Sequence, residues 1–120
     1  MSEQTPFGRI EISPVAIASI AARSASLAYG IVGLADKNLA DGVMRALSGS
    51  VHRGVAVSVE GERVTIDLYV VVEYGTRIAS VAASLQNLVR FNVEKALGIP
   101  GEAVVVNVHV QGLRISNTDV

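Results

Sequence analysis

Apolar and polar residues alternate in four short segments of the chain, which is the pattern of strands with one buried face. The segments are residues 8–12, 55–59, 64–70 and 104–110. Each is bounded by glycine, proline or charged residues that favour turns. The sequence therefore predicts four strands, of which the last exposes Val105, Asn107 and His109 on its polar side.

The second and third of these strands are expected to form a hairpin, because a two-residue turn at Gly61-Glu62 connects them. This turn pairs Glu60 with Arg63, and it pairs Val57 with Ile66. Opposite charges and apolar side chains then face each other across the two strands. One face of the hairpin is therefore predicted to be buried.

The first helix is expected to begin at Pro14, because Ser13 is a favourable N-cap and proline suits the first helical position. Gly30 and Gly33 are expected to end it. Apolar side chains cover almost its whole circumference, so this helix requires cover on two sides. A shorter helix over residues 36–48 is one source of the second cover, and another subunit is the alternative.

The second long helix is expected to open at Thr76 and to stop at Gly98, and its apolar residues recur with helical periodicity. The order of elements is then βαββαβ. Right-handed crossovers give an α+β fold, a split-βαβ or ferredoxin-like sandwich with one mainly antiparallel sheet and its helices on one face. Residues 7–115 form this single domain, between flexible ends at residues 1–6 and 116–120.

Composition and charge exclude several classes of function. The 120 residues contain 10 basic and 11 acidic side chains, so no basic surface for nucleic acid or for an anionic membrane is expected. With no cysteine, the chain has no disulfide, thiol nucleophile or cysteine-ligated zinc. Residues 14–35 are long enough to cross a membrane, but Arg23 and many small side chains argue against a span.

Titratable side chains gather on the polar face of the predicted sheet, where Asp67, Glu73 and His109 lie with Tyr69. An enzyme would have to use this set. A solvated sheet face explains the same alternation, and this interpretation is favoured. His52 and His109 lack the close spacing of a metal motif. No catalytic residue, metal or cofactor is therefore assigned.

Three motifs occur in order along the chain: Gly8-Arg-Ile-Glu-Ile12, Val71-Val-Glu-Tyr-Gly75 and Val106-Asn-Val-His-Val-Gln-Gly112. From about Phe7 to Ile115 the chain resembles the alkaline-shock, or envelope stress response, protein family of mainly Gram-positive bacteria. The resemblance implies a small cytoplasmic protein of cell-envelope homeostasis, without demonstrated catalysis. Some members are held at the inner face of the membrane by a membrane-anchoring protein, and some are encoded beside a fatty-acid kinase-like protein. Both are implied as partners.

The second motif is assigned a structural role. Gly75 permits a tight turn from strand to helix, while alternation directs Tyr74 towards the core and Glu73 outwards. Gly112, which closes the third motif, is also assigned a structural role.

Two sets of residues are predicted to contact a second subunit: Ala18, Ala22, Ala25 and Tyr29 on the first helix, and Asn107, His109 and Gln111 on the last strand. For the second set, ordinary solvated positions remain an equal alternative. We expect a non-enzymatic, self-associating interaction module of the envelope stress response that docks on a membrane-bound or lipid-metabolism partner. The alternative is a regulator of lipid metabolism that binds a small ligand or acyl chain between the first helix and the sheet.

Overall fold

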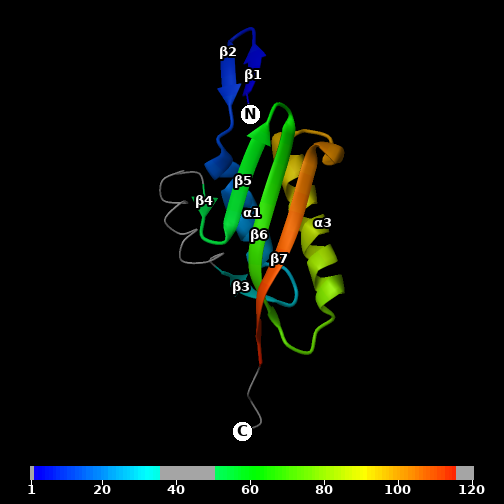
Figure 1. The fold of residues 1–120 in the computed structure, drawn as a ribbon. Coiled ribbons are helices and arrows are strands. Elements are labelled where there is room, and N and C mark those ends of the chain that lie inside the picture. Colours follow the sequence, from blue (N-terminus) through cyan, green and yellow to red (C-terminus); the bar gives the residue numbers. More distant parts are fainter. Residues whose placement is uncertain (1, 36–50, 116–120) are drawn as a thin grey trace.

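The computed structural model describes residues 2–35 and 51–115, and Figure 1 shows their arrangement. The helix predicted over residues 36–48 and the C-terminal segment 116–120 lie outside the described residues. In chain order the elements are β1 (Ser2–Thr5), β2 (Gly8–Glu11), α1 (Pro14–Ser26), β3 (Ile31–Leu34), β4 (Val51–His52), β5 (Val55–Glu60), β6 (Arg63–Glu73), α3 (Ile78–Leu97), the 3-10 turn η1 (Gly101–Ala103) and β7 (Val104–Arg114).

β6 lies at the centre of the main sheet (Figure 1). β5 and β3 pair with it in antiparallel orientation along one edge, and β7 pairs with it in parallel along the other. β4 extends the sheet beyond β5. α1 and α3 pack on the same face of this sheet. The α+β fold class, with one mainly antiparallel sheet and helices on one face, is confirmed.

The hairpin of β5 and β6 has the predicted register. Glu60 lies opposite Arg63, and Val57 lies opposite Ile66. Gly61 supplies the positive φ of +61° that the tight turn requires. Every second residue of β6, from Val64 to Val72, is buried against the helices.

The first predicted strand forms, but not in the main sheet. β2 pairs with β1 in a separate two-stranded sheet that projects from the body (Figure 1). The strand that pairs in parallel with β6 is β7, and not β2. Residues 2–5 were predicted to be flexible, but in the structure they form the strand β1. The Thr5 hydroxyl helps to close the turn, since it accepts from the Phe7 N–H and donates to the Gly8 carbonyl.

α1 ends earlier than its apolar pattern indicates. Its last residue is Ser26, and Leu27 is the C-cap. Ile31 pairs with Val72 of β6, so the following segment is a strand rather than a helical turn. Gly30, with a φ of +84°, makes the connection. The prediction that Gly30 and Gly33 end the helix was therefore wrong, because pairing with β6 overrides the helical periodicity.

α3 begins at Ile78, two residues after the predicted start. The Thr76 hydroxyl instead donates to the Glu73 carbonyl and stabilises the turn before the helix. Gly98 is the C-cap in the left-handed conformation, as the sequence indicates. None of the helices in the described part of the chain has both the length and the hydrophobicity that crossing a membrane requires.

Candidate functional site

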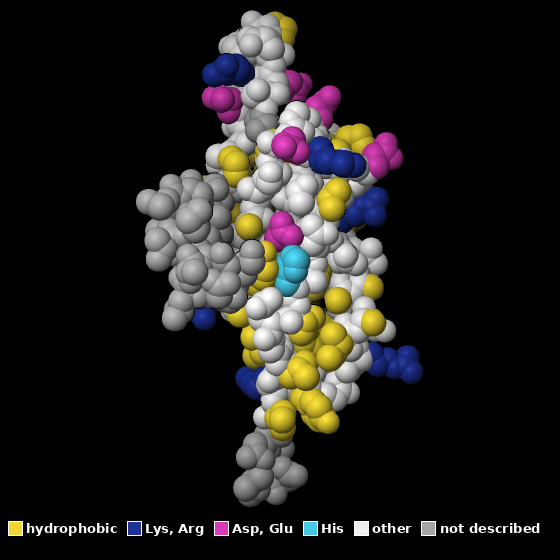
Figure 2. Space-filling view, viewed as in Figure 1, with side chains coloured by type: hydrophobic (Ala, Val, Ile, Leu, Met, Phe, Trp, Pro, Cys, Tyr) yellow, Lys and Arg dark blue, Asp and Glu magenta, His cyan; other side chains and the backbone are white. Residues whose placement is uncertain are grey.

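The face of the main sheet opposite the helices carries the polar side chains that the sequence singles out. Alternate residues of β6 project from this open face, and the parallel register places Asp67 beside Asn107 and Tyr69 beside His109. We call these four residues the open-face cluster. Figure 2 shows a histidine next to an acidic side chain near the middle of this face.

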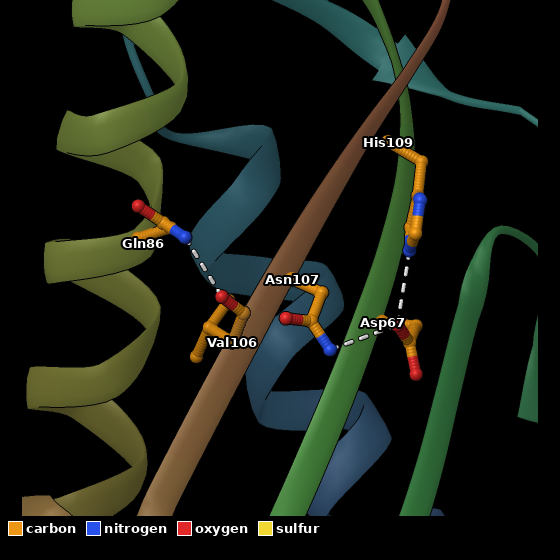
Figure 3. Close-up of polar contacts among 5 residues, drawn as sticks. All are labelled: Asp67, Gln86, Val106, Asn107 and His109. Carbon is orange, nitrogen blue, oxygen red and sulfur yellow. Dashed lines mark hydrogen bonds and ion pairs between the residues drawn. The ribbon is translucent and has the colours of Figure 1, made fainter.

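Direct contacts hold the open-face cluster together (Figure 3). The Nε2 atom of His109 lies 2.9 Å from Oδ1 of Asp67, and Nδ2 of Asn107 donates to the same oxygen over 3.2 Å. The rings of Tyr69 and His109 are stacked, with centroids 4.5 Å apart and planes 13° from parallel. The carboxylate therefore orients two neighbouring side chains, and the aromatic stack fixes the imidazole plane.

The cluster is open to solvent. The side chain of His109 is 41% exposed and that of Asp67 is 28% exposed. Water weakens the attraction between such groups, so the pair contributes little to folding. Within residues 2–35 and 51–115, no group of three histidine or acidic side chains could hold a metal ion. The arrangement presents oriented hydrogen-bonding groups and an aromatic pair, as a recognition surface does.

Glu73 lies apart from the other predicted titratable residues. Its Oε1 atom is 3.1 Å from Nη2 of Arg114, which lies opposite it in β7. The structure therefore brings Asp67, Tyr69 and His109 together but leaves Glu73 in a second pair. Sequence reasoning missed Arg114, because the irregularity in β7 conceals its register with Glu73.

The second and third motifs end in irregular backbone. Tyr74 is 62% exposed, so the prediction that it faces the core was wrong. β6 ends at Glu73 and its alternation stops there. Gly75 has a φ of +97°, which agrees with the tight turn assigned to it. Gly112 lies opposite Val71 after a register shift, and the extra residue in the shift is Gln111.

The alanine side of α1 is covered within the subunit. Ala18 and Ala25 are fully buried, which corrects their assignment to a contact with a second subunit. The cover comes from elements of the same subunit, since α1 packs against β5 and β3 of the sheet and against α3, where Asn92 donates a hydrogen bond to the Ser24 hydroxyl. Ala22 is half-buried, and Tyr29 is 85% exposed.

A hollow of about 340 Å³ lies between α1 and β3. Aliphatic side chains form much of its wall, and Arg53 also lines it. It corresponds in position to the crevice that the sequence suggests for an apolar ligand. Its lining residues are Ala22, Ala25, Ser26, Val32, Gly33, Leu34 and Arg53.

Comparison with known proteins identifies the family. The model of the alkaline shock protein 23 family, described as having a cell envelope-related function, matches residues 2–115. The chain belongs to this family. The resemblance drawn from the three sequence motifs is therefore confirmed. The function described for the family concerns the cell envelope.

Relatives of similar length occur in Gram-positive bacteria. The uncharacterized protein YloU of Bacillus subtilis is 41% identical over 116 residues, which cover 95% of each chain. The uncharacterized protein Spy1614 of Streptococcus pyogenes is 33% identical over 113 residues and 92% of each chain. Among solved structures, a variant of the MamM CTD aligns with a TM-score of 0.47 and 12% identity, covering 81% of this chain and 92% of that one.

Proposed function

We propose that this member of the alkaline-shock family is a non-enzymatic interaction module of the envelope stress response. It self-associates and docks on a membrane-bound or lipid-metabolism partner, such as a membrane-anchoring protein or a fatty-acid kinase-like protein. It acts in the cytoplasm, at the inner face of the membrane when bound. The observation that carries this proposal is the open-face cluster, which stands on a sheet face that neither α1 nor α3 covers.

The geometry of the cluster favours recognition over catalysis. Oδ1 of Asp67 already accepts from two side chains, and the Tyr69 and His109 rings hold each other. Side chains that are fixed before binding lose little conformational entropy when a partner docks. Aromatic residues with a polar atom are also enriched at the centres of protein interfaces.

Hydrophobic side chains extend the open face along β6 and β7. Val71 follows Tyr69 on the open side of β6, Val105 lies opposite Thr65 on the same side of β7, and both are half-buried. Figure 2 shows hydrophobic side chains gathered on this face towards the end of the molecule where β7 finishes. A partner can therefore cover a polar, aromatic centre and an adjoining apolar area in one contact.

The docking proposal is tested by replacing the centre of the open-face cluster in cells that express the protein. In the double variant Tyr69→Ala and His109→Ala, we expect the fraction recovered with the membrane to fall by about tenfold. This factor corresponds to a loss of about 1.4 kcal/mol of binding free energy. The matched control is Ser80→Ala with Ser84→Ala, two exposed positions on α3. If the double variant folds and is recovered with the membrane as well as the wild type is, the open face is not the docking surface.

The hollow between α1 and β3 supports a second candidate, a regulator that binds a small ligand or acyl chain. Its volume of about 340 Å³ is in the range of ligand pockets, and its wall is largely aliphatic. Native mass spectrometry of gently purified protein separates the candidates. A discrete added mass on the 12.5 kDa chain supports the ligand, whereas multiples of 12.5 kDa alone support assembly.

A further inference from the structure

The hairpin of β1 and β2 packs little of its surface within its own chain. All residues of the two strands except Thr5 are exposed. Phe7, in the turn, is 99% exposed, and Ile10 is 52% exposed. An isolated two-stranded hairpin is marginally stable in water, and three or more strands are usually needed. The structure therefore leaves an ordered hairpin without the packing that such a hairpin requires.

A hollow of about 350 Å³ lies at the base of this hairpin. Ile10 and Ile12 form its wall on the hairpin side, and Leu97 and Ile99 form its wall on the body side. Apolar side chains thus line part of a cavity open to solvent, whose remaining wall includes Ser2, Glu3 and Glu62, and the cavity lies beside an arm whose own Phe7 is 99% exposed. An apolar side chain from a second molecule, placed at the base of the arm, would explain both the open hollow and the exposed Phe7.

We propose that the hairpin is a dimerisation arm, in which β2 pairs with β2 of a second copy of this chain. The pairing is antiparallel, about a twofold axis at Ile10. This inference rests on the self-association proposed above and names its surface. Among the described residues β2 has one strand neighbour, β1, so its other edge is available. The two hairpins then form a four-stranded sheet.

The charges of β2 are complementary to themselves in this register. With Ile10 opposite the partner's Ile10, Arg9 lies opposite the partner's Glu11, and symmetry repeats the pair. In the single chain Arg9 and Glu11 are neighbours on one face of β2, with Nη2 and Oε1 3.3 Å apart. Their ion pair is exposed, so exchanging it for two intermolecular pairs costs little.

The same register brings each Phe7 to the base of the partner's arm. Phe7 lies opposite the partner's Ser13, and Gly8 lies opposite the partner's Ile12, which lines the hollow. Two buried phenylalanines contribute about 300–500 Å² of interface. A specific interface needs about 1,200 Å² in total, and the paired strands and the walls of the two hollows supply the rest.

The test uses charge-reversal variants of the full chain, because opposite reversals must rescue each other across an intermolecular contact. Arg9→Glu places glutamates opposite glutamates, and Glu11→Arg places arginines opposite arginines. We expect each variant alone to dimerise about tenfold more weakly than the wild type, by sedimentation velocity across a concentration series. An equimolar mixture of the two variants should dimerise as well as the wild type.

Arg77→Glu is the control, since it reverses one exposed charge at the start of α3, far from the arm along the chain. It should leave dimerisation unchanged. Phe7→Ser should weaken dimerisation without unfolding the single chain, because that side chain is 99% exposed there. Circular dichroism checks that every variant is folded.

The outcomes separate this inference from the proposal on which it rests. If the wild type dimerises and the Arg9 and Glu11 variants dimerise equally well, the arm is wrong and self-association stands. If each variant is weakened but the mixture is not rescued, the proposed register is wrong. A wild type that stays monomeric at all concentrations overturns self-association itself.

Discussion

Ser24 joins the two helices through a buried hydroxyl. Its side chain is 2% exposed, donates to the Ile20 carbonyl over 2.9 Å and accepts from Asn92 Nδ2 over 2.8 Å. A buried polar group costs stability unless it is hydrogen-bonded. Ser24 and Asn92 satisfy each other, and their bond fixes α1 against α3.

Ser24→Ala should lower the free energy of unfolding by about 1 kcal/mol, because the Asn92 amide loses its acceptor in a half-buried position. The matched control is Ser26→Ala in the same helix, where the exposed hydroxyl donates to the Arg23 carbonyl. Urea unfolding measures both variants. Equal stability of the two would show that the bond between the helices contributes nothing.

Gly30 is required at the turn between α1 and β3. Its φ is +84°, and an added Cβ would lie 2.8 Å from Cγ2 of Val81. Gly30→Ala should therefore destabilise the protein by about 2 kcal/mol or more, through backbone strain and the clash. Gly61→Ala tests the strain alone, since a Cβ there meets open space. Thermal melts should show the larger decrease for Gly30→Ala.

At the scale of elements, the helices differ in how far their apolar residues predict burial. In α3 the buried residues are Val81, Leu85, Val89 and Val93, which follow the helical period. In α1 alanines take much of the buried surface, and Leu27 at its end is 71% exposed. An apolar side chain near a helix end is therefore a weak indicator of the core.

Leu85→Ala should lower the free energy of unfolding by about 2–5 kcal/mol, because it opens a cavity at a fully buried position. The same change at Leu27 should have an effect within about 0.5 kcal/mol, since that side chain is mostly in water. Denaturant titration of both variants gives the comparison. A large loss at Leu27 would mean that its exposed surface is covered in solution.

The sequence predicts local elements better than long-range pairing. Alternation and a two-residue turn determine the β5–β6 register, and both signals lie within a few residues of Gly61. The strand at Ile31 was missed because its apolar residues also continue the pattern of α1. Alternation placed Asp67 and His109 on one face, but only the parallel register beside β6 brings them into contact.

At the scale of the whole molecule, the proposal that the protein is not an enzyme can be tested on the titratable side chains of the open face. The triple variant Asp67→Asn, Glu73→Gln and His109→Asn removes their titratable groups without a large change in volume. We expect its melting temperature to stay within about 5 °C of the wild type, because exposed ion pairs contribute little to stability. Turnover of a metabolite by the wild type that the triple variant lacks would contradict the proposal.

The parallel pairing of β6 with β7 affects how the chain folds during synthesis. β7 follows α3 in the sequence, so one long edge of β6 has no β7 to pair with until residues up to Arg114 have been made. β6 is rich in valine and other residues that favour strands, and unpaired strands of this kind associate readily. Shortened chains that stop before β7 should therefore aggregate more readily than the full 120-residue chain, in which the finished sheet no longer exposes that edge.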